Sequence, residues 1–226
     1  MTTFVLIPGA GGSAWYWSKL VPALRAAGHH AIAVDLPGDD PHVGIARYAN
    51  LTAQAAGDSE DVVLVAQSMG GFTAPLACEQ ITVQGLVFVN AMIPVPGESA
   101  GDWWENVGSS NARIQAARAG GYTEELDPEI YFLHDVSSDV AAEGAAYQRD
   151  EVDIAFQQPC DFTAWPNVPT LVLAGCDDRF FPAAFQSAVA HDRLGLSTER
   201  IPGGHLCALS QPAALADRLT AFNVQL

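Results

Sequence analysis

Basic residues are scarce in this 226-residue chain: ten lysines and arginines stand against 26 aspartates and glutamates, leaving a formal net charge of −16. A surface of this sign repels the phosphates of nucleic acids and the headgroups of anionic membranes. No apolar run approaches the roughly 20 residues that a membrane-spanning helix needs. We therefore expect neither a nucleic acid nor a membrane as a partner.

Cysteine is also sparse, and the start of the chain lacks the features of a secretory signal. Met1–Val5 contains no basic region, and Pro8 and Gly9 interrupt the apolar run that follows. The four cysteines form no C-x-x-C pair and no zinc-type spacing; they are Cys78, Cys160, Cys176 and Cys207. These features favour free thiols in a reducing cytoplasm.

Apolar residues are plentiful, at 49% of the chain with a mean hydropathy of +0.14, so a substantial buried core is expected. The negative charge is unevenly distributed. Residues 97–161 contain 14 acidic but three basic residues, a net −11, and the remainder of the chain carries −5. This shift in composition predicts a separate acidic segment over 97–161.

Short β-rich runs alternate with helical patterns, which is typical of a parallel sheet. The predicted strands are 3–7, 31–34, 62–66, 85–90, 170–174 and 198–201. The predicted helices are 17–27, about 44–56, from Ser68 to about 79, 185–189 and 212–222. We expect an α/β core of about six strands with helices on both faces, formed by 1–96 and 162–226, and a helical cap insertion over 97–161.

A glycine-rich turn follows the first predicted strand. Gly9–Ala14 satisfies G-x-G-x-x-[GA], and Asp35 ends the next strand, as in a dinucleotide site. A helix should begin inside such a turn so that its N-terminus faces the pyrophosphate. Trp15–Trp17 stands there instead, so a dinucleotide role is disfavoured.

A second turn, after the third predicted strand, carries Ser68. A nucleophilic serine at a strand-to-helix turn needs small residues two positions before and after it, because strand and helix approach closely there. Ala66 and Gly70 meet that need. The alternative is an ordinary turn in which the serine caps the helix.

A serine at such a strand-to-helix turn is activated by an acid and then a histidine later in the chain, and this sequence has both in that order. Asp177 and Asp178 both follow the strand 170–174, and His205 follows the last strand. The fourth strand ends in Asn90 with no carboxylate beside it, so we expect no acid from that position.

The chain resembles the α/β-hydrolases, in particular the branch that contains plant methylesterases, hydroxynitrile lyases and bacterial esterase-like proteins. Residues 4–10 with 15–17 are similar to that branch's first strand and oxyanion loop, and 205–212 to its histidine loop. The resemblance covers about 1–95 and 165–222.

The resemblance implies a role for five residues. Ser68 would be the nucleophile and His205 the general base, and the family's spacing of glycine and proline around the acid selects Asp178 over Asp177. The backbone N–H groups of Ala10 and Met69 would form the oxyanion hole.

Three departures from the family pattern bear on function. Pro8 stands where the family usually has histidine, and Leu206 follows His205 where hydroxynitrile lyases carry lysine. Gly9 stands where those lyases have threonine, so hydrolysis is favoured over cyanohydrin cleavage. The chain also begins at what is usually the third strand of the fold, which again predicts about six strands.

The resemblance thus implies a serine hydrolase that cleaves a small, largely apolar carboxylic ester through an acyl-enzyme, without metal or organic cofactor, as a monomer or homodimer. The alternatives are a lyase or C–C bond hydrolase with the same residues, and a non-catalytic small-molecule receptor. The candidate substrate-binding residues are aromatic; they are Trp15, Trp103, Trp104, Tyr131 and Phe132.

Other polar residues have simpler interpretations. His29–His30 is expected in a solvated turn and not at a metal, and His134–Asp135 at the surface or a helix cap more than in the pocket. Cys176 and Cys207 are expected to pack and not to act as nucleophiles. The acidic cap should repel anionic substrates.

Overall fold

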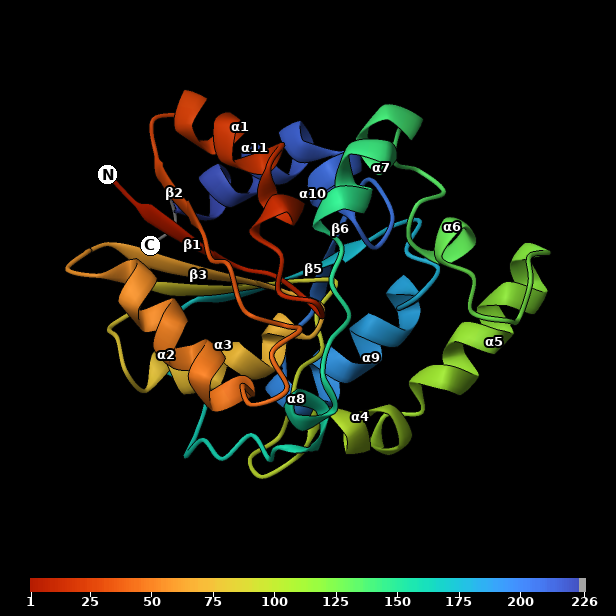
Figure 1. Cartoon of the computed structure of the whole chain (residues 1–226), viewed down its shortest axis with the longest axis horizontal. Helices are drawn as coiled ribbons and strands as arrows, with labels where there is room; N and C mark the ends of the chain where they lie inside the picture. Colours follow the sequence, from red (N-terminus) through yellow and green to blue (C-terminus); the bar gives the residue numbers. More distant parts are fainter. Residues whose placement is uncertain (224–226) are drawn as a thin grey trace.

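The computed structural model describes residues 1–223 and contains a six-stranded, all-parallel sheet in the order β2-β1-β3-β4-β5-β6 (Figure 1). The strands are β1 Thr3–Ile7, β2 His30–Ala33, β3 Val62–Gln67, β4 Gly85–Val89, β5 Thr170–Gly175 and β6 Thr198–Ile201. All six predicted strands are confirmed, each to within one residue at either end.

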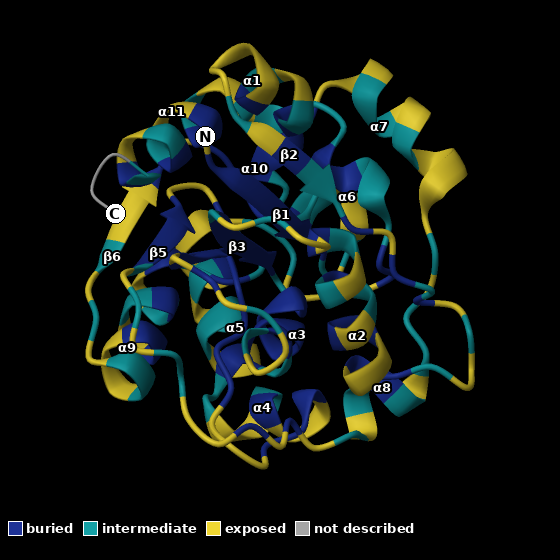
Figure 2. Cartoon of the chain, turned by 90° about the vertical axis from the view of Figure 1, so that its left-hand side faces the viewer, coloured by how far each residue is buried: buried dark blue, intermediate teal, exposed yellow. Residues whose placement is uncertain are grey.

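The strand residues divide between the two faces of the sheet by parity, because successive side chains of a strand point to opposite sides. In β1, Val5 and Ile7 pack on one face with Phe72 of the helix α3 (Gly70–Cys78), and Phe4 and Leu6 pack on the other. Burial on both faces explains why the central strands are almost entirely apolar. The central strands accordingly form the buried layer in Figure 2, whereas the edge strand β6 is largely exposed and the helices carry exposed residues on their outer sides.

Helices cover both faces (Figure 1). One layer holds α1 Leu20–Ala26, α10 Cys207–Ser210 and α11 Pro212–Asn223. The opposite layer holds α2 Ile45–Ala56, α3 Gly70–Cys78 and α9 Ala183–Leu194. The predicted fold class, an α/β sandwich of about six strands, is therefore confirmed.

The helix predicted over 17–27 begins later than expected: α1 starts at Leu20, and a separate 3₁₀ turn, η1 Ala14–Trp17, precedes it. Proline has no N–H to donate and fits without penalty in a helix's first turn. Because α1 begins at Leu20, Pro22 falls in that turn, whereas a continuous helix would have placed it in the interior.

The acidic segment 97–161 is helical, as predicted, and forms an arc beside the core in Figure 1. Its elements are α4 Ala100–Asn106, α5 Ser109–Gly120, α6 Pro128–Tyr131, α7 Ser138–Gly144, η2 Ala145–Tyr147 and α8 Asp153–Gln157. Its two ends meet: the Gly97 N–H donates to the Cys160 carbonyl and the Cys160 N–H to the Glu98 carbonyl, both at 2.9 Å. We call this segment the cap.

A largely buried ion pair joins the start of the cap to α9. The Arg193 guanidinium donates to both carboxylate oxygens of Glu98 and, at 2.6 Å, to the Ile93 carbonyl. The side chains are 11% and 2% exposed, so the cap's first turn is fixed to the core.

Candidate active site

The turn between β3 and α3 carries Ser68. Its φ of 49° is in the left-handed region, which side chains other than glycine rarely adopt. The helix that follows runs against neighbouring backbone: a Cβ on Gly70 would lie 2.6 Å from the Pro8 carbonyl oxygen, and one on Gly71 only 1.7 Å from that of Met92. The two glycines therefore permit the packing that keeps Ser68 in its strained conformation.

Ser68 stands at one end of a hydrogen-bonded series of three side chains. The His205 Nε2 lies 3.1 Å from the Ser68 Oγ, and the His205 Nδ1 lies 2.9 Å from the Asp178 Oδ2. The other Asp178 oxygen accepts the backbone N–H groups of Phe180 and Phe181 at 2.9 and 2.8 Å. A buried carboxylate held in this way has a fixed orientation toward the imidazole.

The two adjacent aspartates occupy different environments. Asp178 is buried at 5% exposure, whereas Asp177 is exposed and offers its backbone N–H to the Gly203 carbonyl. The structure thus brings Asp178, and not Asp177, to His205.

The loop after β1 passes directly against Ser68. A Cβ on Gly9 would lie 2.6 Å from the Gln67 Oε1 and 2.8 Å from the Ser68 Cβ, so glycine is required for this approach. The backbone N–H groups of Ala10 and Met69 donate to no atom of residues 1–223. Both remain available for an external acceptor beside Ser68.

Two buried side-chain amides fix the loop that carries His205, and sequence analysis did not identify them as part of the site. The Asn90 Nδ2 donates to the carbonyls of Gly204 and His205 at 2.9 and 3.2 Å, and its Oδ1 accepts the Gly175 N–H at 2.7 Å. The Gln67 Nε2 donates to the same His205 carbonyl at 3.3 Å. Asn90 itself has a φ of 48°, and that unusual conformation directs its amide into the loop.

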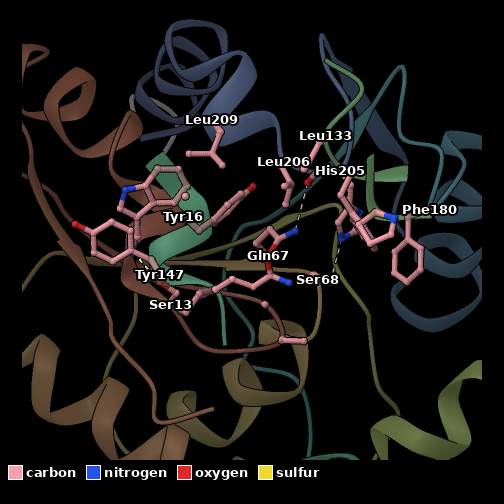
Figure 3. A pocket seen from close by; sticks show the side chains of 18 of the residues that line it. Ser13, Tyr16, Gln67, Ser68, Leu133, Tyr147, Phe180, His205, Leu206 and Leu209 are labelled. Carbon is pink, nitrogen blue, oxygen red and sulfur yellow. Dashed lines mark hydrogen bonds between the residues drawn. The ribbon is translucent and has the colours of Figure 1, made fainter. Parts of the chain in front are cut away.

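A cavity of about 820 Å³ opens above Ser68 between the core and the cap. Figure 3 shows His205 and Phe180 toward one end of the cavity, Tyr147 toward the other, and Tyr16 with Leu209 along the wall between. Its aromatic lining consists of Trp15, Tyr16, Trp104, Phe132, Tyr147, Phe156 and Phe180. The structure therefore places three of the five predicted substrate-binding residues, Trp15, Trp104 and Phe132, on its wall.

The other two, Trp103 and Tyr131, do not line the cavity, and this expectation is corrected. The Trp103 indole donates to the Ile93 carbonyl at 3.2 Å and is 1% exposed. The Tyr131 hydroxyl donates to the Thr123 carbonyl and its ring lies under the Arg113 guanidinium. Each is buried because its polar group has a partner inside the protein.

Asp135 neither caps a helix nor lines the cavity, the roles considered for it from the sequence. Its Oδ2 accepts the Gly204 N–H at 2.6 Å, one residue before His205, so this cap carboxylate contacts the histidine loop. The neighbouring His134 also packs there: a Cβ on Gly204 would lie 2.8 Å from its Cε1.

The cysteines near the site differ in exposure. Cys207 is fully buried, and burial, aided by the negative charge of Asp178, raises the pKa of its thiol to about 12. It is therefore protonated at neutral pH and unsuited to nucleophilic attack. Cys176 is exposed.

Asp35, the acid of the alternative dinucleotide motif, is already engaged. It accepts the Ala14 N–H at 2.9 Å and pairs with Arg149 of the cap at 2.7 Å. Across residues 1–223, no cluster of three or more histidine, cysteine or acidic side chains could hold a metal ion. The His29 ring packs edge-on against Phe4. None of the helices found up to Asn223 has both the length and the apolar character to cross a membrane.

A parallel sheet with a strained serine turn, followed by an acid and a histidine in loops after later strands, is the architecture of the α/β-hydrolases. The sequence profile of the Alpha/beta hydrolase family matches residues 4–218, and the chain belongs to this family. It is 36% identical to an alpha-hydroxynitrile lyase of Arabidopsis thaliana over 252 residues, covering 97% of this chain and 96% of that protein.

Two further proteins are similar. Probable esterase PIR7A of Oryza sativa subsp. indica is 36% identical over 110 residues, which cover 43% of this chain and 42% of the rice protein. The chain thus aligns with less than half the length of this curated relative. The crystal structure of polyneuridine aldehyde esterase superposes with a TM-score of 0.78 at 25% identity, covering 98% of both chains.

Proposed function

We propose that the protein is an esterase that cleaves largely apolar carboxylic esters through an acyl-enzyme on Ser68. One observation carries this proposal: the hydrogen-bonded series from Ser68 through His205 to Asp178 stands beside two free backbone N–H groups at the floor of the cavity. Similarity to esterases agrees with it.

In the proposed reaction, the Ser68 Oγ attacks the ester carbonyl carbon while the His205 Nε2 takes the hydroxyl proton. The carbonyl oxygen becomes an oxyanion, which the N–H groups of Ala10 and Met69 stabilise. The intermediate collapses, His205 gives its proton to the leaving alcohol oxygen, and the acyl group remains on Ser68. Water then attacks the acyl carbon with His205 as base, releasing the acid and restoring Ser68.

Asp178 orients the imidazole in this scheme. An ionised carboxylate only accepts hydrogen bonds, so the His205 Nδ1 must carry the proton and the Nε2 is left free to act as base. The edges of the Phe132, Phe180 and Phe181 rings surround His205, with ring centroids 5.1–5.4 Å away. This apolar surround strengthens the electrostatic pull of Asp178 on the imidazolium that forms.

The cavity favours uncharged substrates with apolar groups. Its aromatic wall and volume of about 820 Å³ suit esters with bulky apolar parts as well as small ones. Arg149 is among the residues that line the cavity, but its guanidinium is paired with Asp35.

Labelling with a fluorophosphonate probe tests the nucleophile. The wild type should react, whereas Ser68→Ala should not, and His205→Ala should react far more slowly because nothing accepts the proton. Equal labelling of wild type and Ser68→Ala would refute the proposal.

The acid is tested by a matched pair of neighbouring variants. Asp178→Asn stabilises the wrong imidazole tautomer and should lower kcat on p-nitrophenyl esters by about 10⁴-fold, the effect expected for this kind of change. Asp177→Asn, one residue away and exposed, should retain wild-type kcat. The reverse order of the two variants would assign the acid to Asp177.

A lyase remains the second candidate, because the similarity to the Arabidopsis lyase extends over nearly the whole chain. Release of cyanide from an aromatic cyanohydrin would support it. We expect none, since Leu206 stands where the resemblance would require lysine.

A further inference from the structure

The cap returns to the core along the candidate oxyanion loop. The Arg149 carbonyl oxygen lies 2.3 Å from the point where a Cβ on Gly11 would stand, so the two backbones are in direct contact. Three residues later, the Val152 N–H donates to the Gly38 carbonyl at 2.9 Å. Residues 149–152, which we call the cap return, thus lie against both the oxyanion loop and the segment after β2.

Glu151 of the cap return bonds to the loop itself. Its Oε2 accepts the Gly11 N–H at 2.8 Å, and its Oε1 accepts the Tyr48 hydroxyl of α2 at 2.6 Å. No lysine or arginine of residues 1–223 forms an ion pair with it. Burying part of a carboxylate whose hydrogen-bond donors are all neutral costs folding free energy. An apolar side chain would cover the same surface at a lower cost in free energy.

The Gly12 end of the oxyanion loop is already held, since the Gly12 N–H donates to the Gly9 carbonyl at 3.1 Å and the Gly12 carbonyl accepts the Leu36 N–H at 2.8 Å, whereas Glu151 adds a restraint at Gly11. It has glycine at positions 9, 11 and 12, and the φ values of Gly11 and Gly12 are 81° and 68°. Glycine has the widest conformational freedom of any residue. The Gly11 N–H belongs to the peptide that immediately follows Ala10, so holding it fixes the backbone on the carboxyl side of Ala10.

We propose that Glu151 is a positioning residue: by accepting the Gly11 N–H and the Tyr48 hydroxyl, it holds the oxyanion loop so that the Ala10 N–H faces the reacting carbonyl. The inference rests on the proposed esterase function and adds a residue of the cap to it. Glu151 does not touch the substrate in this scheme; it acts through the backbone of the loop.

The proposal has a pH signature. Tyr48 of α2, Gly11 of the loop and Arg149 of the cap return surround Glu151, with Asp39 beyond Tyr48. Burial raises the pKa of Glu151 above its ordinary value, although its hydrogen bonds and the charge of Arg149 oppose this. As pH falls through this raised pKa, the carboxylate gains a proton and holds the Gly11 N–H less strongly.

Glu151→Ala tests the positioning role directly. Displacing one oxyanion donor without removing it should lower kcat on p-nitrophenyl butyrate by about 10- to 10²-fold, with KM within twofold of wild type. The affinity for a trifluoromethyl ketone, which forms an oxyanion on Ser68, should fall in parallel. Glu124→Ala is the matched control, because that cap carboxylate is exposed and, within residues 1–223, pairs with Arg118 of the cap and with no other basic residue; it should keep wild-type kcat.

Two milder variants cover the case in which Glu151→Ala fails to fold. Glu151→Gln can still accept the Gly11 N–H and should recover most of the lost kcat at neutral pH. The ratio of wild-type to Glu151→Gln kcat should then shrink toward one as pH falls, since every other group of the site is common to both proteins and cancels in the ratio. Tyr48→Phe should lower kcat less than Glu151→Ala, because one of the two bonds survives.

The outcomes separate this proposal from the proposed function. Wild-type kcat in Glu151→Ala, a loss confined to KM, or a pH-independent ratio would each overturn the positioning role while Ser68 still labels with fluorophosphonate. Failure of the wild type to label would overturn the esterase proposal itself.

Discussion

Asn90 is a fully buried amide that joins three loops of the candidate site. Its Nδ2 serves the carbonyls of Gly204 and His205, and its Oδ1 accepts from Gly175 and from the Gln186 Nε2. Each buried group left unpaired costs about 1–3 kcal/mol. Asn90→Ala should therefore lower the free energy of unfolding by about 3 kcal/mol and reduce kcat, as measured by urea denaturation and ester hydrolysis.

Asn90→Asp separates hydrogen bonding from packing, because it preserves shape. At pH 7 its carboxylate would face two carbonyl oxygens that it cannot donate to, and it should be less stable than Asn90→Ala. The deficit should narrow at pH 5, where protonation of the buried carboxyl supplies a donor. An Asn90→Asp protein as stable as wild type at pH 7 would contradict the network.

The candidate residues that sequence could identify share one property: a local motif surrounds them. Ser68 follows from small residues two positions away on either side, and His205 from its place after the last strand. Glu151 and Asp135 have no such motif, because their partners lie 140 and 69 residues away. Contacts of that range arise only when the cap folds onto the core.

The cap's first helix is held by the ion pair of Glu98 with Arg193. Burial alone would raise the pKa of Glu98, but the bonds from Arg193 and Asn106 outweigh it and hold the pKa below its ordinary value of 4.5. The resulting stabilisation is fully present above that ordinary value and is lost as pH falls through the lowered one.

Glu98→Gln should accordingly destabilise the protein by about 3 kcal/mol at pH 7, because it leaves the Arg193 charge largely buried without its counter-charge. The difference from wild type should decrease when unfolding is measured at pH 3. Glu124→Gln, which alters an exposed pair, should change the stability far less at either pH. Equal changes in the free energy of unfolding from both substitutions would show that burial of the Glu98–Arg193 pair contributes nothing to stability.

Helices and strands were easier to predict from the sequence where they are more deeply buried. The four central strands are almost entirely buried, so their apolar runs are unbroken and their boundaries were clear. Most cap helices are short, and α7 buries no residue, so no apolar stripe marks the beginning or end of α7. Trp103 and Tyr131 were misplaced for a related reason: an aromatic residue on a cap helix can face the cavity or the core, and spacing alone does not decide which.

The whole molecule carries a charge of −16, concentrated on the cap beside the cavity. Glu129 lies on the cavity wall, and Asp35 neutralises Arg149 there. An anionic ester should therefore be hydrolysed more slowly than a neutral ester of equal size, and the difference in kcat/KM should shrink as salt screens the field. Comparing p-nitrophenyl hemisuccinate with p-nitrophenyl pentanoate at low and high ionic strength tests this; a preference for the anion at low salt would contradict it.

The meeting of the two cap ends at Gly97 and Cys160 also concerns how such a protein can diversify. Because both junctions lie within one backbone hydrogen bond of each other, an inserted segment of almost any length can leave and rejoin the sheet there without moving β4 or β5. Loop closure between neighbouring points adds little free-energy cost as the insert grows. The junction is thus a natural place for recombination to exchange one cap for another, provided that the incoming segment supplies its own counterparts to Glu98 and Glu151.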